Sequence, residues 1–503
     1  FRHWDHWEDG KYSHLFVWTP PDLGGKAEEA RDLTPGLTTD IPSHPFGDMS
    51  DVDIAPDGKI IAFATRVSGR ENAWRTNMDI FTVPTDGRAK PMDITAANKA
   101  YEFQPVFSPD GKSIAYRQMV RAGYEADRQR IAIVDVANHH SRVLTEAWDR
   151  SAETITWNPD GKTLYATADN LGNRSIFSVD VATGAAKPIV DKGTVGAPRI
   201  AGDRLVFAKD TLVQPTELFS VKLDGTGLEQ LTHFNDTRVK AIQWGSYEQY
   251  SFKGAKGDSV YGFAMKPAGF VPGNKYPVAF IIHGGPQGSM GDHFHYRWNP
   301  EVFAGHGYGV VFVDFHGSTG YGQAFVDAIN GDWGGAPYDD LMAGLDAALK
   351  KYPWLDDQHM AALGASFGGY MINWINGKTD RFKALVCHDG NIDERMAYFD
   401  TEELWFPEWE HGGTPWDKPE GYTKHNPIDL VKNWKTPTLV IHGGMDFRVV
   451  DTQGMGTFTA LQRKGIPSRF VHFPDENHWV LKPQNSLLWH HEVLAWIDRF
   501  TKR

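Results

Sequence analysis

A repeated hairpin unit in the first half of the chain is the feature that most limits its fold. Three segments, 54–65 (IAPDGKIIAFAT), 107–118 (FSPDGKSIAYRQ) and 157–168 (WNPDGKTLYATA), share one pattern. In each, a Pro-Asp-Gly turn leads into an alternating apolar strand, which is typical of tight hairpins. Another strand pair follows each copy, and a weaker copy occupies 197–233. A period of roughly 40–50 residues with four strands per unit indicates β-propeller blades, with a sandwich of unrelated hairpins as the alternative.

The segment before the first full repeat matches only part of a blade. Residues 13–34 resemble the second half of a unit, and no first half precedes them. Because a lone half-blade would leave an unpaired sheet edge, which a closed propeller avoids, the sequence predicts that upstream blades are missing from this chain. The first residue is Phe1, which is compatible with either processing or a fragment. This prediction leaves open an association with a separate N-terminal fragment.

The hydrophobic pattern changes near residue 240. Residues 259–270 have the character of an outer strand, whereas 278–285 and 309–317 are continuous apolar runs, typical of parallel strands buried on both faces. A segment with apolar residues at helical spacing, 338–353, follows them and ends at a proline. Strands that alternate with helices predict a doubly wound, mostly parallel α/β domain.

A Gly-x-Ser-x-Gly motif lies in this second half. Residues 364–368 read Gly-Ala-Ser-Phe-Gly, between an apolar run and an amphipathic helix predicted over 368–376. In α/β-hydrolases such glycines permit the sharp strand-to-helix turn that exposes a nucleophilic serine. We therefore predict Ser366 as a nucleophile, with a structural turn serine as the alternative. The two patterns together predict propeller blades over 1–240 and an α/β-hydrolase catalytic domain over 241–503.

A nucleophilic serine needs a general base and a carboxylate that orients it, and in this fold they follow in the order Ser, Asp or Glu, His. Asp446 follows the predicted strand in 436–450, and His478 follows the one in 468–480. Both lie just beyond the carboxyl ends of strands, where such sheets place their sites. Nearby residues that we expect to support the loops or the strand instead are His442, His472 and Asp475.

A tetrahedral intermediate also needs hydrogen-bond donors for its oxyanion. The glycine-rich segment 283–286 (HGGP) follows an apolar strand. By the general geometry of the fold, the backbone N–H groups of Gly285 and Phe367 are the predicted donors. The alternative is that these glycines only form a turn.

Several segments together carry a resemblance. They are, in chain order behind the repeats, HGGP, GSTGYG (317–322), GDWGG (331–335), GASFGGYM, HGGMDFRV and FPDENHW. The chain thereby resembles the prolyl oligopeptidase family of serine peptidases, in the branch of acylaminoacyl peptidases and dipeptidyl peptidases. TEELWFPEWE (401–410) with GGTPW (412–416) favours the dipeptidyl peptidases.

The resemblance implies an exopeptidase that releases dipeptides from the free N-terminus of oligopeptides through an acyl-enzyme, with the propeller limiting substrate size. It assigns Ser366, Asp446 and His478 as the triad. The alternatives are an acylaminoacyl peptidase or oligopeptidase with the same triad, and a non-catalytic propeller binding protein. Two positions depart from the family pattern. Phe367 and His283 each stand where relatives have a tyrosine, and in the second case that tyrosine is an oxyanion donor.

Candidate substrate-binding residues lie near these motifs. A dipeptidyl peptidase must bind the terminal ammonium of its substrate, for which carboxylates are best suited. The candidates are Glu402, Glu403 and Glu410, with solvated loop charges as the alternative and an acid from the propeller as a further one. Arg448 is a candidate for holding a substrate carbonyl. The residues predicted to line an apolar pocket are Phe367, Phe399, Trp405 and Val449.

Composition excludes other classes of function. A net charge of −13, from 51 basic and 64 acidic residues, argues against nucleic-acid binding. No apolar run is long enough to span a membrane. We expect no cofactor and no metal site, because the run 3–7 (HWDHW) has no matching ligand cluster elsewhere and is predicted to be structural. We expect oligopeptides as partners, leave a homodimer open, and infer a periplasmic or secreted location from the resemblance.

Overall fold

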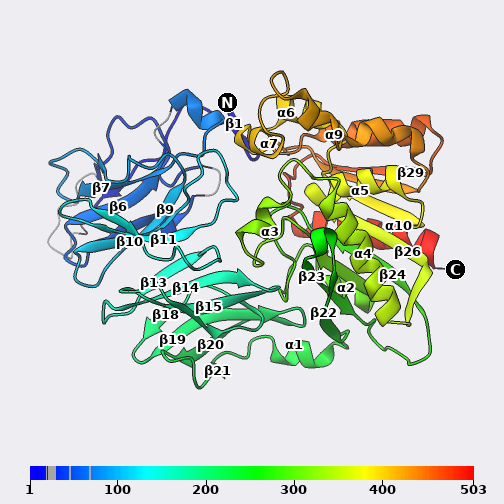
Figure 1. Cartoon of the computed structure of the whole chain (residues 1–503), viewed down its shortest axis with the longest axis horizontal. Helices are drawn as coiled ribbons and strands as arrows, with labels where there is room; N and C mark the ends of the chain where they lie inside the picture. The colour runs from blue at the N-terminus through cyan, green and yellow to red at the C-terminus, as the bar shows by residue number, and fades with distance from the viewer. Residues whose placement is uncertain (19, 21–29, 45–46, 67–68, 503) are drawn as a thin grey trace.

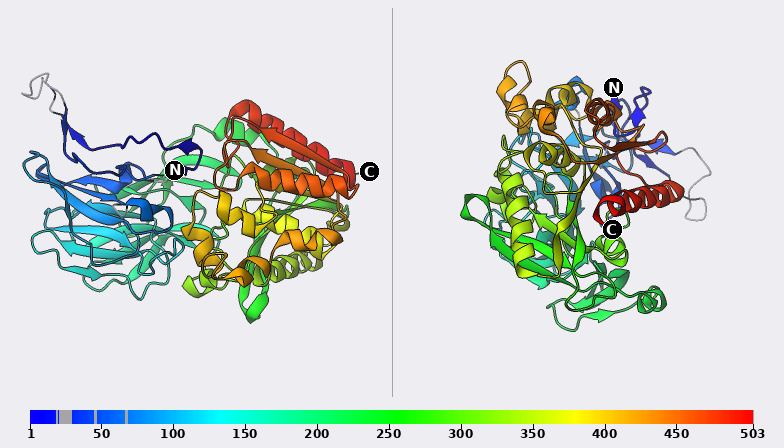
Figure 2. Two further views of the ribbon diagram at one scale, coloured as in Figure 1. Left: turned by 90° about the horizontal axis from the view of Figure 1, so that it is seen from above. Right: turned by 90° about the vertical axis from the view of Figure 1, so that its right-hand side faces the viewer.

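The computed structural model describes residues 1–18, 20, 30–44, 47–66 and 69–502. Figure 1 shows a part rich in β-strands on the left and a part with helices packed around one sheet on the right. Figure 2 shows the same two parts from two other directions, with the C-terminal helix at the surface of the second part. Among the described residues, none of the helices is both long and apolar enough to cross a membrane.

Four antiparallel four-stranded units form the first part, in the positions predicted from the repeats. The first unit contains β5 (Val52–Ile54), β6 (Ile60–Thr65), β7 (Asp79–Pro84) and β8 (Met92–Asp93). The second contains β9 (Glu102–Phe107), β10 (Ser113–Gln118), β11 (Arg130–Asp135) and β12 (Ser141–Val143). The third contains β13 (Thr154–Trp157), β14 (Thr163–Asn170), β15 (Asn173–Asp180) and β16 (Ala186–Val190). The fourth contains β18 (Arg199–Ala201), β19 (Arg204–Thr211), β20 (Gln214–Lys222) and β21 (Glu229–Gln230).

Two further short strand groups complete this part. β17 (Thr194–Val195) pairs with both β15 and β19 and so joins the third and fourth units into one sheet. β3 (Phe16–Val17) and β4 (Arg31–Asp32) form an antiparallel pair within the segment that was predicted to be half a blade.

The repeated Pro-Asp-Gly turns have a simple physical basis. Gly58, Gly111 and Gly161 adopt φ angles of 72°, 70° and 67°, which a residue with a side chain adopts only at a cost. The aspartate before each glycine accepts a hydrogen bond from the backbone N–H two residues further on, with N···Oδ1 distances of 3.0, 3.1 and 2.7 Å. The same local chemistry therefore closes each hairpin.

One eight-stranded sheet forms the second part, with the order β22-β23-β25-β24-β26-β27-β28-β29. Its strands are β22 (Tyr247–Lys253), β23 (Ser259–Met265), β24 (Tyr276–Ile282), β25 (Gly309–Asp314), β26 (Leu355–Ala365), β27 (Ala384–His388), β28 (Thr438–Gly443) and β29 (Ser468–Phe473). Strands β24 to β29 run parallel to one another, and β23 pairs antiparallel with β25 on one side and with β22 on the other. The predicted outer strand is β23, but it lies second from the edge because β22 pairs with its free side.

Helices cover both faces of this sheet. Along β24, Phe280 packs with α4 (Ala336–Lys351) and α5 (Phe367–Lys378), whereas Ile281 packs with α2 (Pro300–Gly305) and α10 (Pro483–Thr501) on the other face. α9 (Asp451–Arg463) packs on β28 through Val440 and Leu461. Because the inner strands β24 and β25 are covered on both faces, their residues are apolar without alternation, as the sequence predicted.

The two parts meet along polar contacts. Asp210 of β19 accepts hydrogen bonds from the His293 ring and from the Phe294 N–H, at 2.8 and 2.9 Å. Arg121 makes two hydrogen bonds to Asp327 in α3 (Gln323–Asp327), at 2.8 and 3.0 Å. We propose a domain boundary at 240/241, at the end of α1 (Asp236–Ala241), since β21 and β22 on either side belong to different sheets.

We expect Arg121 to contribute to stability mainly through the buried carboxylate that it also contacts. Its Nε lies 2.7 Å from Asp127 Oδ1, and the Asp127 side chain is 1% exposed. Arg121→Ala should lower the free energy of unfolding by about 2 kcal/mol or more, because it leaves a buried charge less compensated. Asp327→Asn, which removes a half-exposed pair, should cost at most about 1 kcal/mol. Urea denaturation of both variants tests this ranking, and equal losses would contradict it.

Candidate active site

Ser366 lies at a strained turn between β26 and α5. Its φ and ψ angles are 59° and −122°, a conformation that residues with a side chain rarely adopt. The Ser366 N–H donates to the carbonyl oxygen of His388 at 3.0 Å, and its own carbonyl accepts from the Tyr370 N–H at 2.9 Å. The turn thus presents the side chain at the carboxyl end of the central strand, as predicted.

The glycines around this turn are required by close backbone contacts. A Cβ atom on Gly364 would lie 2.5 Å from the carbonyl oxygen of Gly368. One on Gly368 would lie 3.2 Å from the carbonyl oxygen of His283, and one on Gly369 would lie 2.8 Å from the Cα of Gly390. Only residues without a side chain therefore allow β26, α5 and the loop after β24 to approach this closely.

Asp446 and His478 are joined by a short hydrogen bond. The His478 Nδ1 lies 2.6 Å from Asp446 Oδ2, and both side chains are buried. Asp446 Oδ1 accepts hydrogen bonds from the N–H groups of Arg448 and Val449, both at 3.0 Å. Burial opposes ionisation of Asp446, but the neighbouring His478 ring, together with these hydrogen bonds, holds the pKa of the carboxyl below its ordinary value. A bond at Nδ1 leaves Nε2 of the ring for proton transfer.

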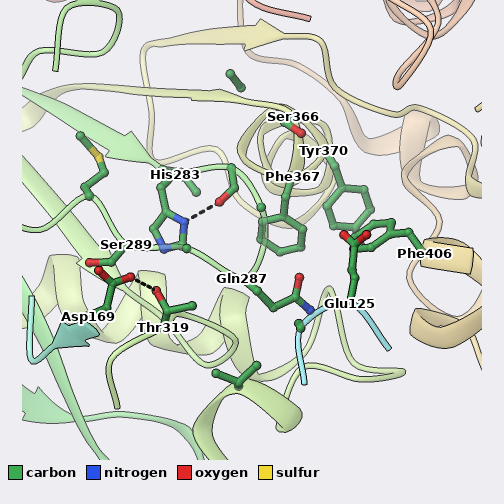
Figure 3. Close-up of a pocket in the computed structure, with 18 of the residues that line it drawn as sticks. Glu125, Asp169, His283, Gln287, Ser289, Thr319, Ser366, Phe367, Tyr370 and Phe406 are labelled. Carbon is green, nitrogen blue, oxygen red and sulfur yellow. Dashed lines mark hydrogen bonds between the residues drawn. The ribbon is translucent and has the colours of Figure 1, made fainter. Parts of the chain in front are cut away.

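Ser366 and His478 line the same cavity, which has a volume of about 580 Å³ and receives residues from both parts of the molecule. The loop after β24 borders it beside the serine, because a Cβ on Gly284 would lie 3.8 Å from Ser366 Oγ. Figure 3 shows Ser366 in this region together with His283 and Phe367. A hydroxyl, an imidazole and a carboxylate thus occur in the combination that supports acyl transfer to serine.

Two backbone N–H groups at this end of the sheet are suited to an oxyanion. Phe367 is the first residue of α5, so its N–H has no acceptor within the helix. Gly285 has a φ of 123°, and its N–H makes no hydrogen bond within the described part of the chain. These are the two donors that the sequence predicts.

His283 uses both ring nitrogens to hold the loop. Its Nδ1 donates to the carbonyl oxygen of Gly284 at 2.7 Å, and its Nε2 lies 2.8 Å from Ser318 Oγ. The ring stacks on Phe315 with a centroid distance of 4.2 Å. Burial lowers the pKa of His283, which keeps the ring neutral. The unprotonated Nε2 then accepts a hydrogen bond from the hydroxyl of Ser318. Its position therefore supports a structural role in shaping the loop.

An ionic cluster lies at one side of the cavity. Arg448 Nη2 is 2.6 Å from Glu402 Oε1 and 3.0 Å from Glu403 Oε2. Arg448 and Glu403 line the cavity, whereas Glu402 is buried behind them. Glu125 of the propeller also lines the cavity and accepts a hydrogen bond from Trp405 Nε1 at 2.5 Å. Burial raises the pKa of Glu403 well above its ordinary value even with Arg448 beside it.

The predicted apolar pocket is only partly composed of the predicted residues. Phe367 and Val449 line the cavity, as expected. Phe399 does not, because it lies on α6 (Glu394–Asp400) with 63% of its surface exposed. Trp405 is also outside the lining, since it is buried and donates a hydrogen bond to Glu125.

Two of the carboxylates predicted to bind the substrate ammonium lie outside the lining as well. Glu402 is buried and accepts a hydrogen bond from Arg448. Glu410 is likewise not in the lining and instead accepts hydrogen bonds from Gln287 and Trp333, each at 2.8 Å.

Other aromatic residues form the wall instead. Trp333 contacts both Phe367 and Tyr370 with ring centroids 5.2 Å apart, and lies 5.7 Å from Phe406. Figure 3 shows Phe367, Tyr370 and Phe406 gathered on one side, with Glu125 reaching the same region from the propeller. Tyr370 could have been anticipated, since it lies one helical turn after Ser366. Glu125 lies in a loop and Phe406 lies in the short helix α7 (Trp405–Glu410). Neither segment has a sequence pattern that predicts a place in the cavity lining.

A second buried carboxylate lies behind the aspartate–histidine pair. Asp389 follows β27 with a φ of 47°, and its Oδ2 lies 3.8 Å from His478 Nδ1 and 2.9 Å from His388 Nε2. Together with His442 and Asp446 it forms a group of potential metal ligands whose donor atoms lie within 4.8 Å of one another. However, His442 Nε2 donates to the carbonyl of Val449 at 2.7 Å and Asp446 binds His478, so these groups already have partners.

Comparisons with known proteins agree with this geometry. Residues 294–503 match the family described as the prolyl oligopeptidase family. Dipeptidyl-peptidase 5 of Trichophyton equinum is 38% identical over 523 aligned residues, which cover 99% of this chain and 72% of that protein. The structure of Pyrococcus horikoshii acylaminoacyl peptidase matches with a TM-score of 0.78 at 24% identity, covering 89% of this chain and 70% of that one.

A third comparison covers nearly the whole chain. The puromycin-hydrolyzing peptidase of Mycobacterium tuberculosis matches with a TM-score of 0.70 at 19% identity, covering 98% of this chain and 87% of that one. At these identities the two structures bear on the fold alone. They confirm the predicted class, an α/β-hydrolase sheet behind β-propeller blades.

The two buried aspartates should differ sharply in their effect on reactivity. Asp446→Asn should lower kcat for a p-nitrophenyl ester by about 10⁴-fold, because the amide no longer holds the productive His478 tautomer. Asp389→Asn should lower it far less, since Asp389 lies more than 1 Å further from Nδ1. Ester hydrolysis at pH 7.5 by both variants tests this difference. Similar losses would indicate that Asp389 shares the orienting role.

Asp389 should also make stability depend on pH. Burial raises its pKa to about 7, so the folded protein binds this proton more tightly than the unfolded chain does. The stabilising contribution is complete below the unfolded pKa of about 4 and is lost as pH rises through about 7. Asp389→Asn keeps a neutral side chain that suits a positive φ. The melting temperature of Asp389→Asn minus that of the parent should therefore increase from pH 5 to pH 8. A difference that stays constant over this range would contradict the raised pKa of Asp389.

Proposed function

The chain belongs to the prolyl oligopeptidase family of serine peptidases, and from this premise we propose that it removes dipeptides from the free N-terminus of oligopeptides. The similarity to dipeptidyl-peptidase 5, at 38% identity over 99% of the chain, supports this specificity. As a serine peptidase it acts on peptides. The remaining argument concerns which residues carry the reaction and which select the substrate.

The proposed reaction uses Ser366 as the nucleophile and His478 as the general base. His478 Nε2 takes the hydroxyl proton as Ser366 Oγ attacks the scissile carbonyl, and later donates it to the leaving amine. Asp446 stabilises the imidazolium through the 2.6 Å bond at Nδ1. The acyl-enzyme that remains is hydrolysed when the same ring activates a water molecule. Throughout, the negative charge on the carbonyl oxygen is stabilised by the N–H groups of Gly285 and Phe367.

The observation that supports cleavage near a free N-terminus is the acidic lining on one side of the cavity. Glu403 and Glu125 come from different domains and both line the space that also contains Ser366. Arg448 offsets only part of the charge of these two carboxylates, so a substrate ammonium would add a second positive group, and charge-assisted hydrogen bonds of this kind are strong. In this proposal Arg448, which Glu402 and Glu403 hold at the cavity lining, lies beside a substrate carbonyl.

The same lining supports this activity over that of an acylaminoacyl peptidase, the main alternative. A blocked N-terminus carries no positive charge, so it would gain no charge-assisted hydrogen bond from Glu403 or Glu125. The aromatic wall formed by Trp333, Phe367 and Tyr370 supports a pocket for an apolar side chain next to the scissile bond. Propeller residues such as Asp149 and Asp169 border the cavity, which supports a limit on substrate size. Export from the cytoplasm remains a prediction from the family resemblance.

The specificity can be tested at Glu403. Glu403→Gln should raise KM for a free-amino dipeptidyl p-nitroanilide by about tenfold or more, since a charge-assisted hydrogen bond is lost. KM for the N-acetylated form of the same substrate should change little. Glu408→Gln is the matched control, because Glu408 lies in the same segment but outside the cavity lining. Steady-state kinetics with both substrates decide the matter, and equal effects on the two would remove the proposed role.

A further inference from the structure

A short hairpin at residues 2–7 contacts the cavity. β1 (Arg2–His3) and β2 (His6–Trp7) pair antiparallel, with Arg2 opposite Trp7 and His3 opposite His6. Trp4 lies in the two-residue turn between them with a φ of 54°. A bulky residue at positive φ is an outlier, and such strain persists where surrounding contacts enforce it. Asparagine or glycine would suit this turn better, so the backbone does not explain the tryptophan.

Hydrogen bonds attach the hairpin to both loops of the proposed aspartate–histidine pair. The Phe447 N–H, next to Asp446, donates to the carbonyl oxygen of Trp4 at 3.0 Å. Asn477, next to His478, donates through Nδ2 to Asp5 Oδ2 at 2.7 Å. The position of the turn is therefore set by the same two loops that carry the proposed catalytic groups.

The Trp4 indole lines the cavity and contacts groups of two kinds. Its ring lies 5.6 Å from that of His478 in an edge-to-face arrangement, and 4.7 Å from that of Trp479. The Arg448 guanidinium lies 5.0 Å from the ring centroid, within the range of a cation–π contact. Trp4 thus touches the proposed general base at the reaction centre and the arginine of the ionic cluster.

We propose that Trp4 determines specificity for the side chain of the substrate's first residue. This proposal rests on the function proposed above. When a dipeptide is released, the first residue lies between the group that binds the ammonium and the scissile bond. Because Trp4 contacts both Arg448 and His478, its indole borders the space that this residue occupies. An indole face favours an aromatic or large aliphatic side chain over glycine.

The hairpin also contains a matched control. Trp7 lies in the same hairpin and contacts Phe447 with a ring-centroid distance of 5.7 Å. It is 64% exposed and does not line the cavity. A variant at Trp7 therefore perturbs the attachment of the hairpin to the catalytic loop without changing the surface that the substrate would meet.

The test compares the parent chain with Trp4→Ala, Trp4→Phe and Trp7→Ala on two substrates, Phe-Ala-p-nitroanilide and Gly-Ala-p-nitroanilide. Trp4→Ala should lower kcat/KM for the phenylalanine substrate by about tenfold or more and for the glycine substrate by less than about threefold. Trp4→Phe should restore most of the preference, and Trp7→Ala should change both substrates equally. If Trp4→Ala does not fold, Trp4→Leu takes its place, with an intermediate preference expected.

Labelling by a fluorophosphonate measures the reactivity of the Ser366 hydroxyl independently of peptide binding. Equal losses on the two substrates in the Trp4 variants, or no loss, would overturn the role of Trp4 while leaving the proposed function intact. A parent enzyme that is labelled at Ser366 but cleaves neither free-amino substrate would overturn the proposed function, and the role of Trp4 with it.

Discussion

The hydrogen bond between Asp446 and His478 is the interaction on which the proposed chemistry depends, and the fold is arranged so that it can form. The two residues follow β28 and β29, which are neighbouring parallel strands, so their loops leave the sheet side by side. Gly444 allows this approach, since a Cβ there would lie 3.0 Å from the backbone of Pro474 in the next loop. The bond is buried, which strengthens it and makes the loss of either partner costly.

Residues of both domains line the cavity, and both domains contribute charged groups to it. Glu125 from the propeller and Glu403 from the hydrolase face the same space, while Arg448 offsets part of their charge. Because these charged groups are largely surrounded by protein, each has more influence than one at the surface. Contacts across the interface, such as the pair of Arg121 and Asp327, join the two domains that carry these groups.

The two departures from the family pattern have different consequences. His283 is occupied with Gly284 and Ser318, so the proposed mechanism assigns oxyanion stabilisation to backbone donors. Phe367 places an aromatic ring in the cavity lining without a hydroxyl, which makes that wall more apolar. Both changes are compatible with the proposed acyl transfer because the predicted oxyanion donors belong to the main chain, where side-chain identity matters little.

The sequence by itself determined the features that depend on local chemistry. The Pro-Asp-Gly hairpins, the buried parallel strands and the glycine-lined turn at Ser366 each follow from residues within a short segment. The order of serine, aspartate and histidine further limited the choice of partners. Only the tertiary structure decided which side chains line the cavity. It placed Phe399 in solvent, buried Trp405 behind the wall, and brought Glu125 and Trp4 to the site. Such contacts join segments hundreds of residues apart, as with Trp405 and Glu125, so no local pattern records them.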